Sequence, residues 1–193
     1  AQGLGVDGIS IDGFECAGHP GEDDVPGLVL IPAAAKEIEI PMIASGGFGD
    51  ARGLVAALAL GADGVQVGTA FLRTTQSAAN DAHRAAITST PAHGSVLTRA
   101  LSGRLARGAL NRAVLELEAS GENAGFPAQN WLTGQFRAAA TARGIGDLQS
   151  LWLGQAAPLA HHDDALAAVA ELRHRPPPPA LAARRRHPPR PPR

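Results

Sequence analysis

Three short apolar runs in the first 70 residues each stop at a glycine-containing turn. They cover residues 6–12, 40–47 and 64–69. Each run is too short for a helix, and an apolar run that ends abruptly at glycine is typical of a buried parallel strand. We therefore predict three strands, with the chemistry of the protein in the loops that follow them.

One amphipathic helix is predicted between the second and third strands. Asp50 is placed to cap its N-terminus, Leu54 and Leu58 provide an apolar face, and Gly61 is placed to end it. A strand, a helix and a second strand in close succession form a βαβ unit, whose strands are parallel and whose crossover is right-handed. The first 90 residues are thus predicted to form an α/β fold built of βα units.

The loops after the second and third strands carry the candidate chemistry, in Ser45, Gly46, Gly47, Gly68 and Thr69. Ligands of parallel α/β sheets bind beyond the carboxyl ends of the strands, and loops without bulky side chains can aim backbone N–H groups at a phosphate. Gly46 and Gly47 alone also fit an ordinary tight turn. Two such ends in adjacent units favour a phosphate site on a parallel β/α barrel.

A glycine-rich loop after the first strand, residues 13–21, contains His19. Histidine exchanges protons near neutral pH, and a loop at this end of a barrel is where catalytic residues gather. The alternative is a solvated loop histidine without a role. Cys16 lies in the same loop and is interpreted as an inert small residue unless it is exposed with a lowered pKa.

The pattern changes to helical beyond residue 90, and residues 91–172 are predicted to form a helical segment that packs on the barrel. Three helices are predicted in and just before it, each from a cap or an apolar stripe. They are residues 78–88 capped by Ser77, residues 107–119 with Leu110, Val114 and Leu117 on one face, and residues 163–173 capped by Asp163 or Asp164 with Leu166, Val169 and Leu172 on one face. Trp131 and Trp152 are interpreted as packing anchors.

The composition fits a cytoplasmic domain with a single core. The chain has 193 residues, of which 45% are hydrophobic, without an apolar run long enough to cross a membrane. The single cysteine excludes an internal disulfide framework and fits a reducing compartment. No metal site is predicted, because the polar cluster at residues 161–164 has no accompanying thiolate or spaced imidazole set.

The last 21 residues, 173–193, differ from the rest in composition. They contain seven arginines, eight of the fifteen prolines and no acidic residue. We predict a disordered or polyproline II tail here. Without it the chain has 10 basic and 18 acidic residues, so the folded part is acidic. The tail also suggests a rival function, binding of nucleic acid, an anionic surface or a proline-recognising domain, although without aromatic stacking residues it is a weak nucleic-acid footprint.

Three stretches of the sequence resemble one known family. They are residues 13–19 (GFECAGH), residues 41–48 (PMIASGGF) and residues 57–72 (ALALGADGVQVGTAFL), and residues 107–114 and 152–156 are also similar to that family. The chain resembles the nitronate monooxygenases, formerly called 2-nitropropane dioxygenases, within the FMN-dependent barrel oxidoreductases. The resemblance extends to about Leu172.

The resemblance implies a role for each candidate residue. His19 matches the catalytic base or transition-state stabiliser near the flavin, and Ala17 matches a backbone contact to FMN. Two loops of that family hold the FMN phosphate from either side. One is matched here by Ser45, Gly46 and Gly47, and the other by Gly68 and Thr69. The activity implied is oxidation of an alkyl nitronate through FMN, with dioxygen as the oxidant, to a carbonyl compound and nitrite.

The chain is expected to correspond to the C-terminal part of a TIM-type (β/α)8 barrel, because only three βα units are recognisable before residue 90. The activity could be lost in such a fragment, and self-association is one way to complete the barrel. Related FMN barrels that use NAD(P)H, the quinone reductases and enoyl thioester reductases, are an alternative within the enzyme class. A non-catalytic barrel remnant with a basic Pro/Arg interaction tail is another.

Overall fold

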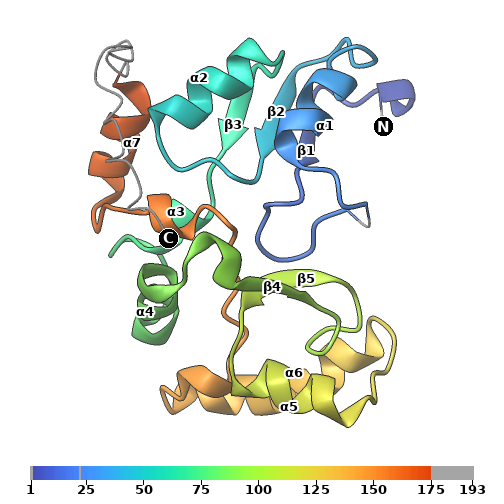
Figure 1. Cartoon of the computed structure of the whole chain (residues 1–193), viewed down its shortest axis with the longest axis vertical. Coiled ribbons are helices and arrows are strands. Elements are labelled where there is room, and N and C mark those ends of the chain that lie inside the picture. The colour runs from blue at the N-terminus through green and yellow to red at the C-terminus, as the bar shows by residue number, and fades with distance from the viewer. Residues whose placement is uncertain (1, 22, 175–193) are drawn as a thin grey trace, which may run out of the picture.

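A computed structural model describes residues 2–21 and 23–174 of the chain (Figure 1). The predicted Pro/Arg tail therefore lies outside the described residues, apart from its first two. The chain begins with a short 3-10 helix, η1 (Gln2–Leu4), which leads into the first strand. In Figure 1 a sheet with its helices occupies the upper part of the molecule and a hairpin with two helices occupies the lower part.

The upper part is a three-stranded parallel sheet in the order β1-β2-β3. Its strands are β1 (Ile9–Asp12), β2 (Met42–Ser45) and β3 (Gly64–Gln66). The register places Asp12 opposite Ser45 and Ser45 opposite Gln66, so all three strands end at one edge. The α/β fold with parallel strands predicted from the apolar runs is thus confirmed.

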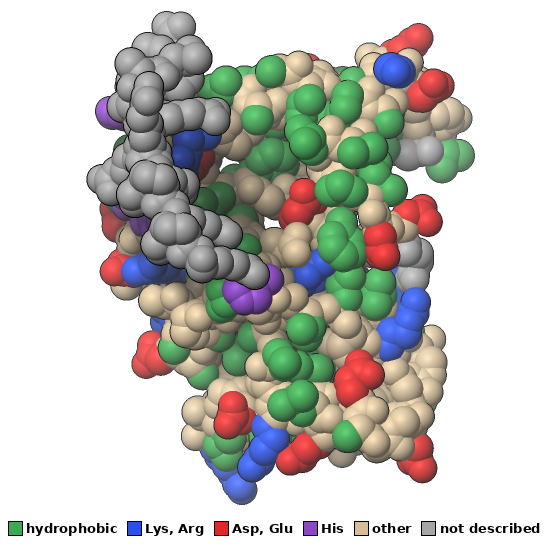
Figure 2. Space-filling model, viewed as in Figure 1, with side chains coloured by type: hydrophobic (Ala, Val, Ile, Leu, Met, Phe, Trp, Pro, Cys, Tyr) green, Lys and Arg blue, Asp and Glu red, His purple; other side chains and the backbone are tan. Residues whose placement is uncertain are grey.

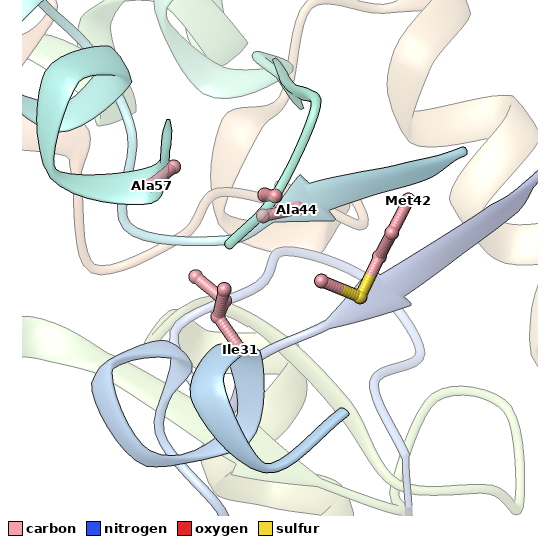
Figure 3. Close-up of a cluster of buried hydrophobic side chains, with 5 residues drawn as sticks. Ile31, Met42, Ala44 and Ala57 are labelled. Atoms are coloured by element: carbon pink, nitrogen blue, oxygen red, sulfur yellow. The ribbon is translucent and has the colours of Figure 1, made fainter. Parts of the chain in front are cut away.

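Two helices cover one face of this sheet, α1 (Gly27–Ala34) and α2 (Ala51–Ala59). As predicted, Asp50 caps α2, because its carboxylate accepts hydrogen bonds from the backbone N–H groups of Arg52 and Gly53. Side chains from both helices meet those of β2 in the core. This core cluster consists of Ile31, Met42, Ala44, Ala57 and Ala62, and Figure 3 shows the first four packed between the sheet and the helices.

The opposite face of the sheet is bare, in the sense that its side chains are exposed to solvent. Side chains alternate along the strands, so Met42 and Ala44 point to the helices while Ile43 points the other way and is 43% exposed. Ser10 and Gln66 share this outer face and are also exposed. Exposed hydrophobic side chains are spread over much of the molecular surface seen in Figure 2. All-parallel sheets are normally covered on both faces, so the exposure of this face is unusual for such a sheet.

The lower part combines a β-hairpin with two helices. Strands β4 (Ser95–Thr98) and β5 (Ala106–Ala109) pair antiparallel, and helices α5 (Arg112–Ser120) and α6 (Ala128–Ala142) lie below them (Figure 1). The remaining elements are α3 (Thr69–Leu72), α4 (Asp81–Ser89), η2 (Ala92–Gly94), η3 (Gly146–Leu148), η4 (Ala157–Leu159) and α7 (Ala165–Arg173). Helix α7 returns to pack beside α2. None of the helices described is long and apolar enough to cross a membrane.

The prediction of a helix over residues 107–119 is wrong for its first turn. Arg107 to Ala109 belong to β5, and a Cβ on Gly108 would meet the backbone oxygen of Leu151 at 2.8 Å. The helix begins only after Asn111, whose side chain accepts a hydrogen bond from Val114 N at 3.1 Å. Leu110, predicted on the apolar face, is therefore exposed in the connecting loop. The segment 91–172 thus contains a β-hairpin besides its helices.

Two other helix predictions need correction. Asn80, and not Ser77, caps α4, because the side-chain oxygen of Asn80 accepts a hydrogen bond from His83 N at 2.9 Å. The cap of α7 is Asp164, one of the two residues predicted, but its predicted apolar face is not core. Leu166 and Val169 are exposed there, and Ala168 is buried instead.

The two tryptophans differ in their surroundings. Trp131 on α6 is 69% exposed, so its interpretation as a packing anchor is wrong. Trp152 does pack against the buried cluster of Leu101, Ala113 and Val114, as that interpretation requires.

Two substitutions on the same strand test whether the sheet is covered on one face only. Met42→Ala removes a side chain that is 2% exposed and should lower the free energy of unfolding by about 2–5 kcal/mol. Ile43→Ala should lower the free energy of unfolding by less than half as much, because the Ile43 side chain is exposed to solvent. Urea unfolding followed by circular dichroism measures both. Equal losses would show that the second face is also packed.

Candidate functional site

A cavity of about 200 Å³ lies at the edge where the three strands end. All six residues predicted to contact the cofactor line it: Ala17, Ser45, Gly46, Gly47, Gly68 and Thr69. The other lining residues are Asp12, Glu15, Cys16, Phe48, Gln66, Gly154 and Ala156. The parallel register accounts for this convergence, since it sets the ends of β1, β2 and β3 side by side.

The loop after β2 is shaped by two consecutive glycines in the left-handed region. Gly46 has φ +93° and Gly47 has φ +83°, a conformation that side chains with a Cβ rarely adopt. A Cβ on Gly46 would also meet Cys16 Sγ at 2.8 Å and Cys16 N at 3.0 Å. The β2 loop therefore needs glycine for its backbone path and for its close contact with the His19 loop.

The loop after β3 contributes an open glycine and a buried hydroxyl. A Cβ on Gly68 would find no atom within 4 Å, so this position has free space beside it. The Thr69 Oγ1 atom accepts a hydrogen bond from Gly154 N at 3.0 Å. A hydroxyl has one proton to donate, and this bond leaves the Thr69 proton available to an acceptor in the cavity.

The ionisable side chains that line the cavity include the carboxylates of Asp12 and Glu15. The Glu15 carboxylate accepts hydrogen bonds from Gly27 N at 3.0 and 3.2 Å, at the start of α1. None of the described residues that line the cavity is Lys or Arg. The N-terminus of α2 is occupied by its own cap, because the Asp50 carboxylate accepts from the backbone N–H groups of Arg52 and Gly53. The hydrogen bond from the Arg52 side chain lowers the pKa of this carboxyl below its usual value. An anion here would depend on backbone N–H groups and hydroxyls rather than on a cation.

Cys16 is a buried thiol and not a thiolate. Its Sγ atom lies 3.3 Å from Ser45 Oγ. Burial raises the pKa of the thiol to about 11, so it stays protonated at neutral pH. This agrees with its interpretation as an inert residue.

His19 lies beyond the cavity lining, two residues after Ala17, and is exposed. Its Nε2 atom is 2.8 Å from Ser102 Oγ. The ring centroid is 6.0 Å from that of Trp152 and 6.3 Å from that of Phe126. Partial burial, and secondarily the positive charge of Arg104, lower the pKa of His19, so the imidazole is neutral at pH 7 and able to accept a proton.

Arg107 anchors the His19 loop to the β4–β5 hairpin. Its backbone pairs with that of Gly18, with N–H···O distances of 2.6 and 2.9 Å. Its buried guanidinium donates to the Phe14 carbonyl at 2.9 and 3.1 Å and to Ser95 Oγ at 3.2 Å, and stacks 4.6 Å from the Phe14 ring centroid. Burial disfavours the charged form and lowers the pKa of this guanidinium, while the hydrogen bonds to carbonyl and hydroxyl oxygens satisfy its N–H groups.

The contributions of Ser102 and Phe126 had no signal in the sequence, whereas Arg107 and Gly154 were noted only as members of longer stretches. Ser102 is 83 residues from His19, so sequence spacing could not reveal their contact. A Cβ on Gly154 would meet the Glu15 carbonyl oxygen at 2.7 Å. The glycine in this stretch was the one signal that could have indicated a close approach of backbone segments.

The polar cluster at residues 161–164 has structural partners. His162 pairs with Glu171, Asp163 bonds to Arg73 at 3.0 Å, and Asp164 caps α7. Within residues 2–21 and 23–174 no group of three or more His, Cys, Asp or Glu side chains is placed to hold a metal ion.

Comparison with known proteins relates the chain to one family. The family model described as "Nitronate monooxygenase" matches residues 1–172. A "Probable nitronate monooxygenase" of Staphylococcus aureus strain MSSA476 is 38% identical over 177 residues, which cover 87% of this chain and 50% of that protein. The corresponding protein of strain JH9 is 39% identical over 165 residues, 81% of this chain and 46% of its own length.

Solved structures agree with this relationship. Nitroalkane oxidase from Streptomyces ansochromogenes superposes with a TM-score of 0.81 at 34% identity, over 89% of this chain and 52% of that chain. FabK from Thermotoga maritima superposes with a TM-score of 0.76 at 29% identity, over 89% and 54%. The chain thus spans about half the length of the relatives it matches.

Alanine substitutions at Gly46 and Gly68 test whether glycine is required in the loop after β2 but not in the loop after β3. Gly46→Ala should lower the free energy of unfolding by about 1–3 kcal/mol, because alanine is strained at positive φ and its Cβ meets Cys16. Gly68→Ala is the matched control and should change it by less than about 0.5 kcal/mol. Urea unfolding measures both. A Gly46→Ala variant as stable as the parent would contradict the loop geometry.

Proposed function

The chain belongs to the nitronate monooxygenase family, and on that premise we propose that its strand-end cavity holds the phosphate end of FMN. We further propose that the flavin-loaded protein oxidises alkyl nitronates with dioxygen to a carbonyl compound and nitrite. The observation that carries the proposal is the convergence of Gly46, Gly47, Gly68 and Thr69 on one cavity.

The residues present fit a phosphate group. The free space beside Gly68 admits a ligand atom close to the backbone, and the Thr69 hydroxyl has a proton to donate. The cavity of about 200 Å³ is smaller than the roughly 300–1,000 Å³ of sites that enclose a whole drug-sized ligand. A cavity of this size would hold the phosphate end of FMN rather than the whole cofactor.

The parallel sheet is proposed to be part of a TIM-type β/α barrel, with its bare face as the barrel interior. Ser10, Ile43 and Gln66 would then point toward the axis, which accounts for their exposure. Because the chain spans about half of its relatives, further strands must cover this face when the barrel is complete. Self-association is one way to provide further strands.

His19 is proposed to handle the proton of the reaction. FMN supplies the two-electron redox chemistry when it is bound. The lowered pKa keeps the His19 imidazole neutral at pH 7, the form that accepts a proton. The rings of Phe126 and Trp152 lie beside the exposed imidazole, with centroids 6.3 and 6.0 Å from that of His19. Ala17 is proposed as the backbone contact between this loop and the cofactor.

A comparison of the affinities for FMN and riboflavin tests the proposed phosphate site, because the two ligands differ only in the phosphate. FMN should bind at least about tenfold more tightly, as the loss of one charge-assisted hydrogen bond costs roughly 1.5–3 kcal/mol. Gly68→Leu should remove most of that preference by filling the free space. Quenching of flavin fluorescence measures each dissociation constant. Equal affinity for the two ligands, or no binding of either, would contradict the proposal and favour a non-catalytic remnant.

Anaerobic reduction of the flavin-loaded protein tests the proposed substrate. An alkyl nitronate should bleach the flavin absorbance, and NADH or NADPH should not. His19→Ala should slow this reduction by roughly 100-fold or more while FMN stays bound. His93→Ala, an exposed histidine in η2, is the control and should leave the rate unchanged. Reduction by NAD(P)H alone would instead favour the quinone or enoyl thioester reductase alternative.

A further inference from the structure

Ser102 is the hydrogen-bonding partner of His19 and is almost completely buried, with 1% of its surface exposed. Three polar groups lie within hydrogen-bonding distance of its Oγ atom. They are His19 Nε2 at 2.8 Å, the carbonyl oxygen of Arg104 at 2.9 Å and the backbone N–H of Arg104 at 3.3 Å. All three sit in or against the loop between β4 and β5, so the surroundings of this hydroxyl are fixed by the hairpin.

The donors and acceptors around Ser102 Oγ can all be satisfied in only one arrangement of hydrogen bonds. A serine hydroxyl donates one hydrogen bond and accepts two. The Arg104 carbonyl can only accept, so it takes the Ser102 proton, and the Arg104 N–H fills one lone pair. The remaining lone pair faces His19 Nε2 and is satisfied only if that nitrogen carries a proton. With a bare Nε2, two acceptors would compete for one hydroxyl proton.

We propose that Ser102 is a positioning residue that holds His19 in the Nε2–H tautomer and leaves Nδ1 as the proton-accepting atom. The assignment follows from the hydrogen bonds of the chain itself and does not involve flavin. Its meaning for catalysis rests on the proposed function, in which His19 handles the proton. Ser102 then acts through His19 and touches no reacting atom itself.

The backbone next to His19 supports the same role for the hairpin. Gly18 pairs with Arg107 of β5 through two hydrogen bonds of 2.6 and 2.9 Å, directly before His19 in the sequence. The hairpin therefore fixes the loop through Arg107 and the imidazole ring through Ser102. These two independent contacts determine where the ring lies and which nitrogen faces away from the hairpin.

The proposed tautomer also fits proton transfer without rearrangement. When Nδ1 accepts a proton, the imidazolium carries a proton on each nitrogen, and Nε2–H continues to donate to Ser102 Oγ. No hydrogen bond of Ser102 has to break or reverse. The charged group that faces the ring from the hairpin is Arg104, which disfavours the imidazolium and helps to return the proton.

The direct test is long-range ¹H–¹⁵N correlation spectroscopy of the ¹⁵N-histidine-labelled chain at about pH 8, where the imidazole is neutral. The His19 signals are identified by their absence in His19→Gln. We expect His19 Nε2 to carry the proton and Nδ1 to be bare. A protonated Nδ1, or an even mixture of the two tautomers, would overturn the proposal. This result does not depend on flavin binding, so its failure is distinguishable from failure of the proposed function.

Ser102→Ala tests whether the hydroxyl is the cause. It should convert the single tautomer into a mixture, while Ser120→Ala, an exposed serine whose Oγ donates to Leu117 O, should leave the His19 spectrum unchanged. A single Nε2–H tautomer that persists in folded Ser102→Ala would overturn the role of Ser102. If the buried substitution prevents folding, the spectrum of the unsubstituted chain still decides the tautomer.

Discussion

The parallel register of β1, β2 and β3 is the constraint on which the site depends. Because Asp12, Ser45 and Gln66 stand opposite one another, the loops that follow these strands all emerge at the same edge of the sheet. The core on the other side of β2, formed by Ile31, Met42 and neighbouring alanines, holds this register. A slip by one residue would turn Met42 out of the core and displace the glycines from the cavity.

A second layer of backbone contacts closes the cavity around this edge. The segment that follows η3 returns past the His19 loop, with Gln155 N donating to Glu15 O at 3.0 Å and Gly154 N donating to Thr69 Oγ1 at 3.0 Å. The hairpin holds the other side of the same loop through Arg107 and Ser102. The residues beyond the sheet therefore serve the site by fixing the His19 loop.

The sequence predicted the parts of the structure that local patterns determine. The three strands and the Asp50 cap were recognisable, because short apolar runs ending at glycine and a capped amphipathic helix are local signals. Strand β5 was not, since Ala106–Ala109 has little intrinsic strand preference and depends on pairing with β4 and Gly18. The contact between His19 and Ser102 is likewise tertiary, so no pattern of spacing could show it.

The central claim is that the phosphate of FMN lies between the loops after β2 and β3. A crystal structure of the chain with FMN bound tests this most directly, because it locates the phosphorus atom. The account predicts phosphate oxygens within hydrogen-bonding distance of the Thr69 hydroxyl and of backbone N–H groups at Gly46, Gly47 or Gly68. A phosphate bound outside this cavity, such as in the groove between α5 and α6, would contradict it.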